Sequence, residues 1–182
     1  MIMLDCFDGE PDHAPTLTDR YRRWFDYEKD SHAKVMASLQ SVPKDGQSTP
    51  AFIRAVSIMA HIVAARQLWL FRFGLGEKAP TDFFPTDLTL SDLAARLDSV
   101  QAAWSSYMAR LSDGDLVKIF EYKSLDGKWF RNTIEDTLTQ LFGHSWYHRG
   151  QIAMLVRQAG GEPPITDLIY WSRESIPGPA AP

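Results

Sequence analysis

Residues 144–151 have the sequence HSWYHRGQ, in which two histidines stand four residues apart. Apolar residues continue at helical intervals on both sides and predict one helix through the segment: Leu138, Leu141, Ile152 and Leu155. Side chains four residues apart on a helix share one face, with Cβ atoms about 5–6 Å apart. His144 and His148 therefore leave the same apolar face together, where an unpartnered imidazole is costly.

A divalent metal ion would satisfy both rings, because imidazole nitrogen binds Zn, Ni, Cu and Fe. The same spacing occurs on the metal-binding helix of zinc proteases, where a glutamate follows the first histidine. Here Ser145 occupies that position, which argues against a protease. Two histidines that are hydrogen-bonded inside a helical bundle explain the pair equally well, so the pair alone leaves both interpretations open.

A third ligand is needed, because open metal sites usually combine three protein ligands with water. His13 lies in a loose N-terminal segment and would make a poor rigid ligand. His32 has polar neighbours such as Lys29 and is interpreted as a surface or pocket-rim residue. His61 lies in an apolar helical run, which makes it either a hydrogen-bonded core residue or the third ligand.

The predicted fold class is all-α, a four-helix bundle with a small β-hairpin inserted between the third and fourth helices. Asp126-Gly127 between two aromatic-rich runs, 118–123 and 128–132, indicates the hairpin. Hydrophobic periodicity and the positions of Pro and Gly give the four main helices and a short last one: about 16–42, 50–73, 91–111, 134–158 and 166–174.

The length of 182 residues fits one domain. We expect a flexible N-terminal arm over 1–15, the helical domain over 16–175 and a disordered Pro-rich tail over 176–182. The net charge of -4 gives no electrostatic footprint for nucleic acid or an anionic membrane.

A single cysteine, Cys6, rules out an internal disulfide and favours a reducing compartment. The N-terminus carries acids and a proline where a signal peptide needs a basic and then an apolar run. Charged residues interrupt the apolar stretches before they reach the ~20 residues of a membrane span. We therefore expect a soluble, cytoplasmic protein.

Residues 61–69, HIVAARQLW, and residues 144–151 resemble two motifs of the DinB/YfiT-like (damage-inducible DinB) family. The hairpin and residues 166–170 are similar to that family too, so the resemblance spans about 17–174. It implies a four-helix bundle that holds one divalent metal, most often Ni or Zn with Fe or Mn as alternatives, on three histidines. On this chain those ligands are His61, His144 and His148.

The resemblance also implies homodimers and, for some relatives, transferase or isomerase reactions with small thiols such as mycothiol and bacillithiol. Many relatives carry Asn where His32 aligns, so His32 is a candidate pocket residue. Tyr147 is another candidate, together with Tyr27 and Glu28. Arg149 and Gln151 are expected to bond a neighbouring helix or to orient a ligand ring. Gly150 is expected to allow another helix to approach closely.

Two classes of function fit these residues. The first is a metal-dependent enzyme acting on a small-molecule substrate, either a transferase with a small-thiol cosubstrate or a hydrolase of small electrophiles. The second is a non-catalytic stress-response or ligand-binding protein that contains a metal. The sequence identifies no catalytic acid, base or nucleophile. The apolar helix over 50–73 and the aromatic pair at 83–84 are expected to form a dimer contact.

Overall fold

The computed structural model describes residues 14–178, and their fold is mostly helical with one two-stranded antiparallel sheet, as expected. The expectations for Cys6, His13, most of the N-terminal arm and the last four residues lie outside the described range. The elements in chain order are α1 (Leu17–Gln40), η1 (Gly46–Ser48), α2 (Pro50–Arg72), α3 (Leu90–Arg110), α4 (Asp113–Leu116), β1 (Ile119–Lys123), β2 (Trp129–Thr133), α5 (Ile134–Gln158) and α6 (Leu168–Ser172).

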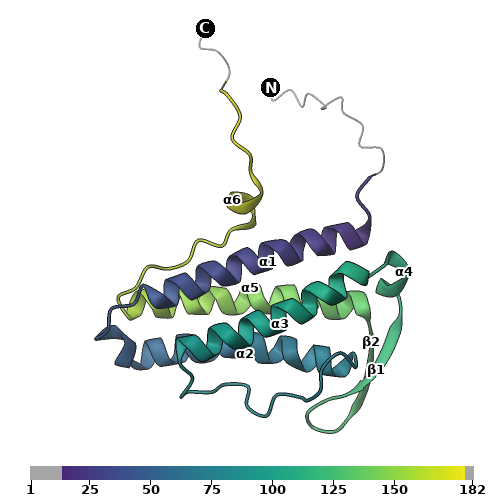
Figure 1. The fold of residues 1–182 in the computed structure, drawn as a ribbon, viewed down its shortest axis with the longest axis horizontal. Coiled ribbons are helices and arrows are strands. Elements are labelled where there is room, and N and C mark those ends of the chain that lie inside the picture. The colour runs from purple at the N-terminus through teal and green to yellow at the C-terminus, as the bar shows by residue number, and fades with distance from the viewer. Residues whose placement is uncertain (1–13, 179–182) are drawn as a thin grey trace.

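Four long helices lie along one another, as Figure 1 shows. The α2 helix packs against α5 and also against α3, while α1 packs against α5 and α3 from the other side. The connection over 74–89 then runs back along α2 to the start of α3 (Figure 1). The α2 helix is therefore covered on several sides, which explains why so many of its side chains are apolar.

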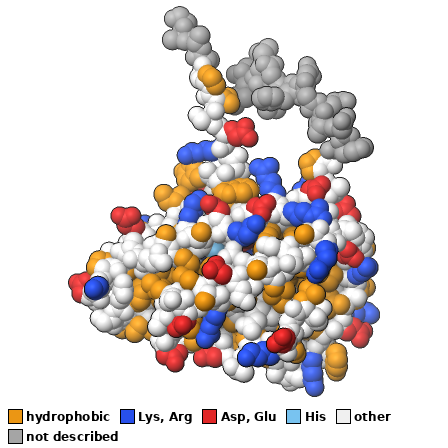
Figure 2. All heavy atoms as spheres, viewed as in Figure 1, with side chains coloured by type: hydrophobic (Ala, Val, Ile, Leu, Met, Phe, Trp, Pro, Cys, Tyr) orange, Lys and Arg blue, Asp and Glu red, His pale blue; other side chains and the backbone are white. Residues whose placement is uncertain are grey.

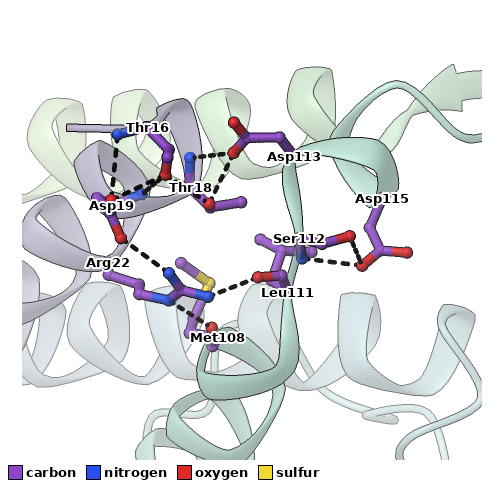
Figure 3. A network of polar contacts seen from close by, with 9 residues as sticks. All are labelled: Thr16, Thr18, Asp19, Arg22, Met108, Leu111, Ser112, Asp113 and Asp115. Carbon is purple, nitrogen blue, oxygen red and sulfur yellow. Dashed lines mark hydrogen bonds and ion pairs between the residues drawn. The ribbon is translucent and has the colours of Figure 1, made fainter. Parts of the chain in front are cut away.

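Side-chain caps fix where the helices begin. Thr16 and Asp19 form a reciprocal capping box at the start of α1, and Thr89 caps α3 as its spacing with Asp92 predicts. Figure 3 shows how the same end of α1 is tied to its neighbours. Asp113 of α4 accepts hydrogen bonds from Thr18, and the Arg22 guanidinium donates to two backbone carbonyls at the end of α3.

The hairpin pairs β1 with β2 from Ile119↔Thr133 to Lys123↔Trp129. Gly127 has φ 86°, the left-handed conformation that glycine adopts easily, in a loop longer than the two-residue turn. Two details were not anticipated. The short helix α4 precedes the hairpin, and the last helix follows Asp167 rather than Thr166.

The expectation for Gly150 was wrong, because a Cβ atom there would have no heavy atom within 4 Å outside its own helix. Close approach occurs instead at Gly46, where a Cβ would lie 2.2 Å from the backbone oxygen of Ala159. We expect Gly150→Ala to raise the free energy of unfolding by about 1 kcal/mol through helix propensity. Gly46→Ala should lower it by about 1–3 kcal/mol through overpacking. Urea unfolding measures both, and a destabilising Gly150→Ala would contradict this account.

Among the described residues, α2 is the one helix that is long and apolar enough to cross a membrane by length and composition. Of its most apolar window, 61% is buried inside the protein, and core helices pass the same test. On the face drawn in Figure 2, Lys and Arg side chains alternate with Asp and Glu, without a large patch of one sign.

Candidate metal centre

Three histidines from two helices come together where α2 and α5 pack. His61 lies on α2, and His144 and His148 lie one turn apart on α5. The Nε2 atoms of His61 and His144 are 3.0 Å apart, and each residue offers a ring nitrogen within 4.8 Å of the others. All three residues are half-buried. The structure thus brings together all three residues named from the sequence.

The opposite ring nitrogens of two of these histidines have partners. The Nδ1 atom of His61 lies 3.2 Å from the backbone oxygen of Phe83, and Nδ1 of His148 lies 2.8 Å from Oε1 of Gln151. Metal-binding histidines commonly donate the second ring N–H to such an oxygen, which fixes the tautomer and the ring orientation. Both Nε2 atoms are thereby left as lone-pair donors.

Burial and neighbouring charges lower the pKa of two of these rings, on His61 and His144. Burial, together with the neighbouring His148 and His61, lowers the pKa of His144 to about 4. Burial also lowers the pKa of His61, with a contribution from His148. Neutral imidazole is the form that binds a metal ion, so at neutral pH His61 and His144 offer their nitrogens without first losing protons.

The donor set fits a divalent cation of the first transition series. Zn–N bonds are about 2.0–2.1 Å long, so nitrogens on one ion stand roughly 3 Å apart. The 3.0 Å separation of His61 and His144 falls in that range. Within residues 14–178, the group contains no carboxylate or thiolate as a fourth ligand. A set of three neutral nitrogens can leave positions open for water or a substrate.

An aromatic residue covers one side of the cluster. The ring of Phe84 stacks on His61 with 4.0 Å between centroids and 8° between planes. The Arg54 guanidinium lies 4.9 Å above the same phenyl ring. Since Phe83 and Phe84 are neighbours, one short segment of the 74–89 connection both contacts Nδ1 of His61 and shields its face.

A buried ionic cluster lies among α1, α2 and α5. Glu28 accepts a 2.6 Å bond from Nη2 of Arg66 and a second bond from Nη1 of Arg149. Arg149 also donates to the Tyr27 hydroxyl at 2.7 Å, and Arg66 lies 3.3 Å from the Ser145 hydroxyl. Burial raises the pKa of Glu28, but the two guanidinium charges outweigh this and hold it below its usual range. The carboxylate is therefore charged.

The other residues named from the sequence have different surroundings in the structure. Gln151 contacts the His148 ring, whereas Arg149 bonds to α1, and contacts of both kinds were expected for these two residues. Tyr147 is 66% exposed beside His148, with 5.0 Å between their rings. The interpretation of His32 as a surface or rim residue was wrong, because it is 1% exposed and lies 3.5 Å from Glu28. Its polar neighbours along α1, such as Lys29, are partly exposed, whereas the His32 side chain itself faces the interior.

The burial of His32 predicts a loss of stability in acid. Burial lowers its pKa to about 3, so the native state keeps the ring neutral while the unfolded chain protonates near 6.5. The contribution of His32 to the free energy of unfolding is therefore fully present above pH 6.5. It falls as the pH drops toward 3, by about 2 kcal/mol at pH 5.

We expect His32→Asn to remove that part of the pH dependence. Urea unfolding of metal-free protein at pH 7 and pH 5 measures it. His61 and His144 titrate alike in both proteins, so their contribution cancels in the comparison. An equal loss between pH 7 and pH 5 in wild type and variant would show that His32 takes up no proton on unfolding.

The sequence did not predict that Arg54, Phe83 and Phe84 lie at the histidine cluster, although the pair at 83–84 was expected at a dimer contact. It also did not predict that Arg66 pairs with Glu28. One signal was available for Arg66. A charged residue within the most apolar helix must pair with an opposite charge, and Glu28 is such a charge in the adjoining helix. The contacts of Phe83 and Phe84 depend on the path of a long connection, which periodicity does not reveal.

Comparison with known proteins agrees with these observations. The sequence profile of the DinB family matches residues 16–177. The chain belongs to the DinB family. The structure is similar to the crystal structure of a DinB-like protein from Bacillus cereus ATCC 10987, with a TM-score of 0.60 and 24% identity. That match covers 84% of this chain and 98% of the other, and it supports the fold alone. No curated protein matches the chain significantly.

Proposed function

We propose that this DinB-family chain is a metal-dependent enzyme built on a four-helix bundle, in which His61, His144 and His148 hold one divalent cation. The convergence of three histidine ring nitrogens, without a fourth protein ligand among residues 14–178, carries the proposal. Ni or Zn fits these nitrogen donors best, and Fe or Mn is the alternative.

The chemistry follows from the donor set. A divalent cation on three neutral ligands keeps its full charge and lowers the pKa of a bound water or thiol toward neutrality. This supports transfer of a small thiol to an electrophile, or hydrolysis of a small electrophile. Phe83 and Gln151 orient the rings of His61 and His148 through their Nδ1 atoms, while Phe84 excludes water from one face of the site.

Turnover assays test this function directly. Protein loaded with Ni or Zn is incubated with small thiols paired with epoxides, alkyl halides and activated esters, beside a His148→Ala variant. We expect turnover only in the loaded wild type, with the variant at least 100-fold slower. Equal rates in both proteins would remove the enzyme function for those substrates. The Tyr147→Phe variant is the matched control, because it keeps the neighbouring ring.

A non-catalytic role is the second candidate. Its support is that, among residues 14–178, the histidine cluster holds no carboxylate that could act as a general acid or base, and that an aromatic ring covers His61. In that case the protein would carry its metal as a stress-response or ligand-binding protein. A loaded protein that binds small thiols without turning over any electrophile would favour this candidate.

The oligomeric state, cellular location and partners of the protein are part of the same proposal. We propose a soluble, cytoplasmic homodimer that acts on small molecules and binds neither nucleic acid nor membrane. The net charge of -4 and the mixed charges of the surface support the absence of a nucleic-acid partner. A monomer in light scattering at micromolar concentration would contradict the dimer.

A further inference from the structure

A cavity of about 450 Å³ lies between α2, α3 and the 74–89 connection. None of the three clustered histidines lines it, so it is distinct from the candidate metal centre. Small apolar residues of α2, such as Ala60 and Ala64, form one wall. Its size falls within the ~300–1,000 Å³ of small-molecule sites. The polar part of the lining comes from Gln67, Lys78, Thr81, Asp82, Asp87 and Arg96.

Two cations stand where this cavity meets a second one. A neighbouring cavity of about 480 Å³ shares Gln67, Lys78 and Arg96 with the first. Over residues 14–178, neither Lys78 nor Arg96 has a carboxylate within the 4.0 Å of an ion pair, although exposed lysines such as Lys118 do. Both charges are therefore free to bind an anionic group of a ligand.

Carboxylates line the first cavity as well. Asp82 accepts a 2.9 Å hydrogen bond from the backbone N–H of Phe84 through Oδ1, which fixes the side chain on the connection. Asp87 has no ion-pair partner within residues 14–178. Positive and negative groups thus line one cavity without pairing with each other.

We propose that this cavity binds a small zwitterion, a molecule about the size of a dipeptide with one carboxylate and one ammonium group. Lys78 and Arg96 receive the carboxylate, Asp82 and Asp87 receive the ammonium group, and the alanine wall contacts the apolar part between them. A ligand of one sign leaves either the two cations or the two carboxylates without a partner, so it binds less tightly.

Calorimetric titration of the full-length, metal-free protein tests the assignment with three probes. These are alanyl-alanine, its N-acetyl derivative, which lacks the ammonium group, and its amide, which lacks the carboxylate. We expect saturable one-site binding of alanyl-alanine and at least tenfold weaker binding of each blocked form. Each form loses a charge-assisted contact that is typically equivalent to about ten- to a hundredfold in affinity.

Variants then locate the site. Arg96→Gln and Asp87→Asn change exposed side chains, and each should weaken alanyl-alanine binding at least tenfold while thermal unfolding stays unchanged. Arg20→Gln, at an exposed arginine of α1, is the matched control and should bind as the wild type does. His148→Ala should also retain binding, so failure of the metal proposal and failure of this one are distinguishable.

Three results would overturn the proposal. The first is no saturable binding of alanyl-alanine. The second is a blocked form that binds as tightly as the zwitterion, which would show that one of the two charge pairs takes no part. The third is unchanged affinity in Arg96→Gln, which would place the binding elsewhere on the protein.

Discussion

Replacing Glu28 by Gln should lower the free energy of unfolding by about 3–5 kcal/mol, the usual loss when one partner of a buried ion pair is removed. The carboxylate is fully buried and is the common acceptor of two guanidinium groups, on Arg66 and Arg149. Gln keeps the shape of the side chain but not its charge. Two buried cations would then face each other without compensation. Urea unfolding of metal-free protein at pH 7 measures the loss.

Asp26→Asn provides the matched control on the same helix. Asp26 pairs with Lys29 at 2.8 Å, but both side chains are partly open to solvent, so this change should cost less than 1 kcal/mol. If Glu28→Gln were no more destabilising than Asp26→Asn, the buried cluster would not be an ionic one. A double variant that also replaces Arg66 by Met should recover part of the loss, because it removes one of the uncompensated charges.

The position of this cluster connects stability with the candidate site. Arg149 directly follows His148, and Ser145 directly follows His144, so alternate faces of α5 serve the two clusters. Arg66 lies on α2 about one turn beyond His61. Through Arg66 and Arg149, Glu28 therefore links α1 to the two helices that carry the histidines. We expect its replacement to loosen metal binding as well as the fold.

Features that depend on residues close together in the sequence were predictable, whereas features that depend on contacts between distant segments mostly were not. The i, i+4 spacing of His144 and His148 is local, and the stop of α5 at Gly160, which has φ 83°, is local too. Their helix and its end were predictable for that reason. His61 was placed with them because it shares an apolar helical setting, and the structure brings it to 3.0 Å from His144.

Contacts between helices were not predictable in the same way. The neighbours of His32 along the chain are polar, yet its ring is enclosed by packing of α1 against other helices. Gly150 was interpreted as a helix contact, because sequence shows the cost of glycine in a helix but not what faces it. The Phe84 ring reaches His61 through a connection without periodicity, so its position depends on tertiary structure alone.

Metal binding should stabilise the wild-type fold and should fail to do so once a ligand is lost. A metal ion at 100 times its dissociation constant raises the free energy of unfolding by about 2.7 kcal/mol when it binds only the native state. For a domain of this size that corresponds to an increase in Tm of about 5–10 °C. Thermal unfolding of chelator-treated protein, with and without Ni or Zn, measures the shift, and His148→Ala should show almost none.

Three variants of α5 distinguish a metal ligand from the residues around it: His148→Ala, Gln151→Ala and Tyr147→Phe. Gln151→Ala removes the oxygen that holds Nδ1 of His148, so metal affinity should fall by about 10–100-fold. The shift in Tm should therefore be smaller than in wild type at the same metal concentration, and should recover when the metal is raised in proportion to the weaker affinity. Tyr147→Phe keeps the ring beside His148 and should match the wild type. Surface binding by scattered side chains would instead leave all three variants equal. A normal shift in His148→Ala would therefore exclude the three-histidine site, whatever metal the protein contains.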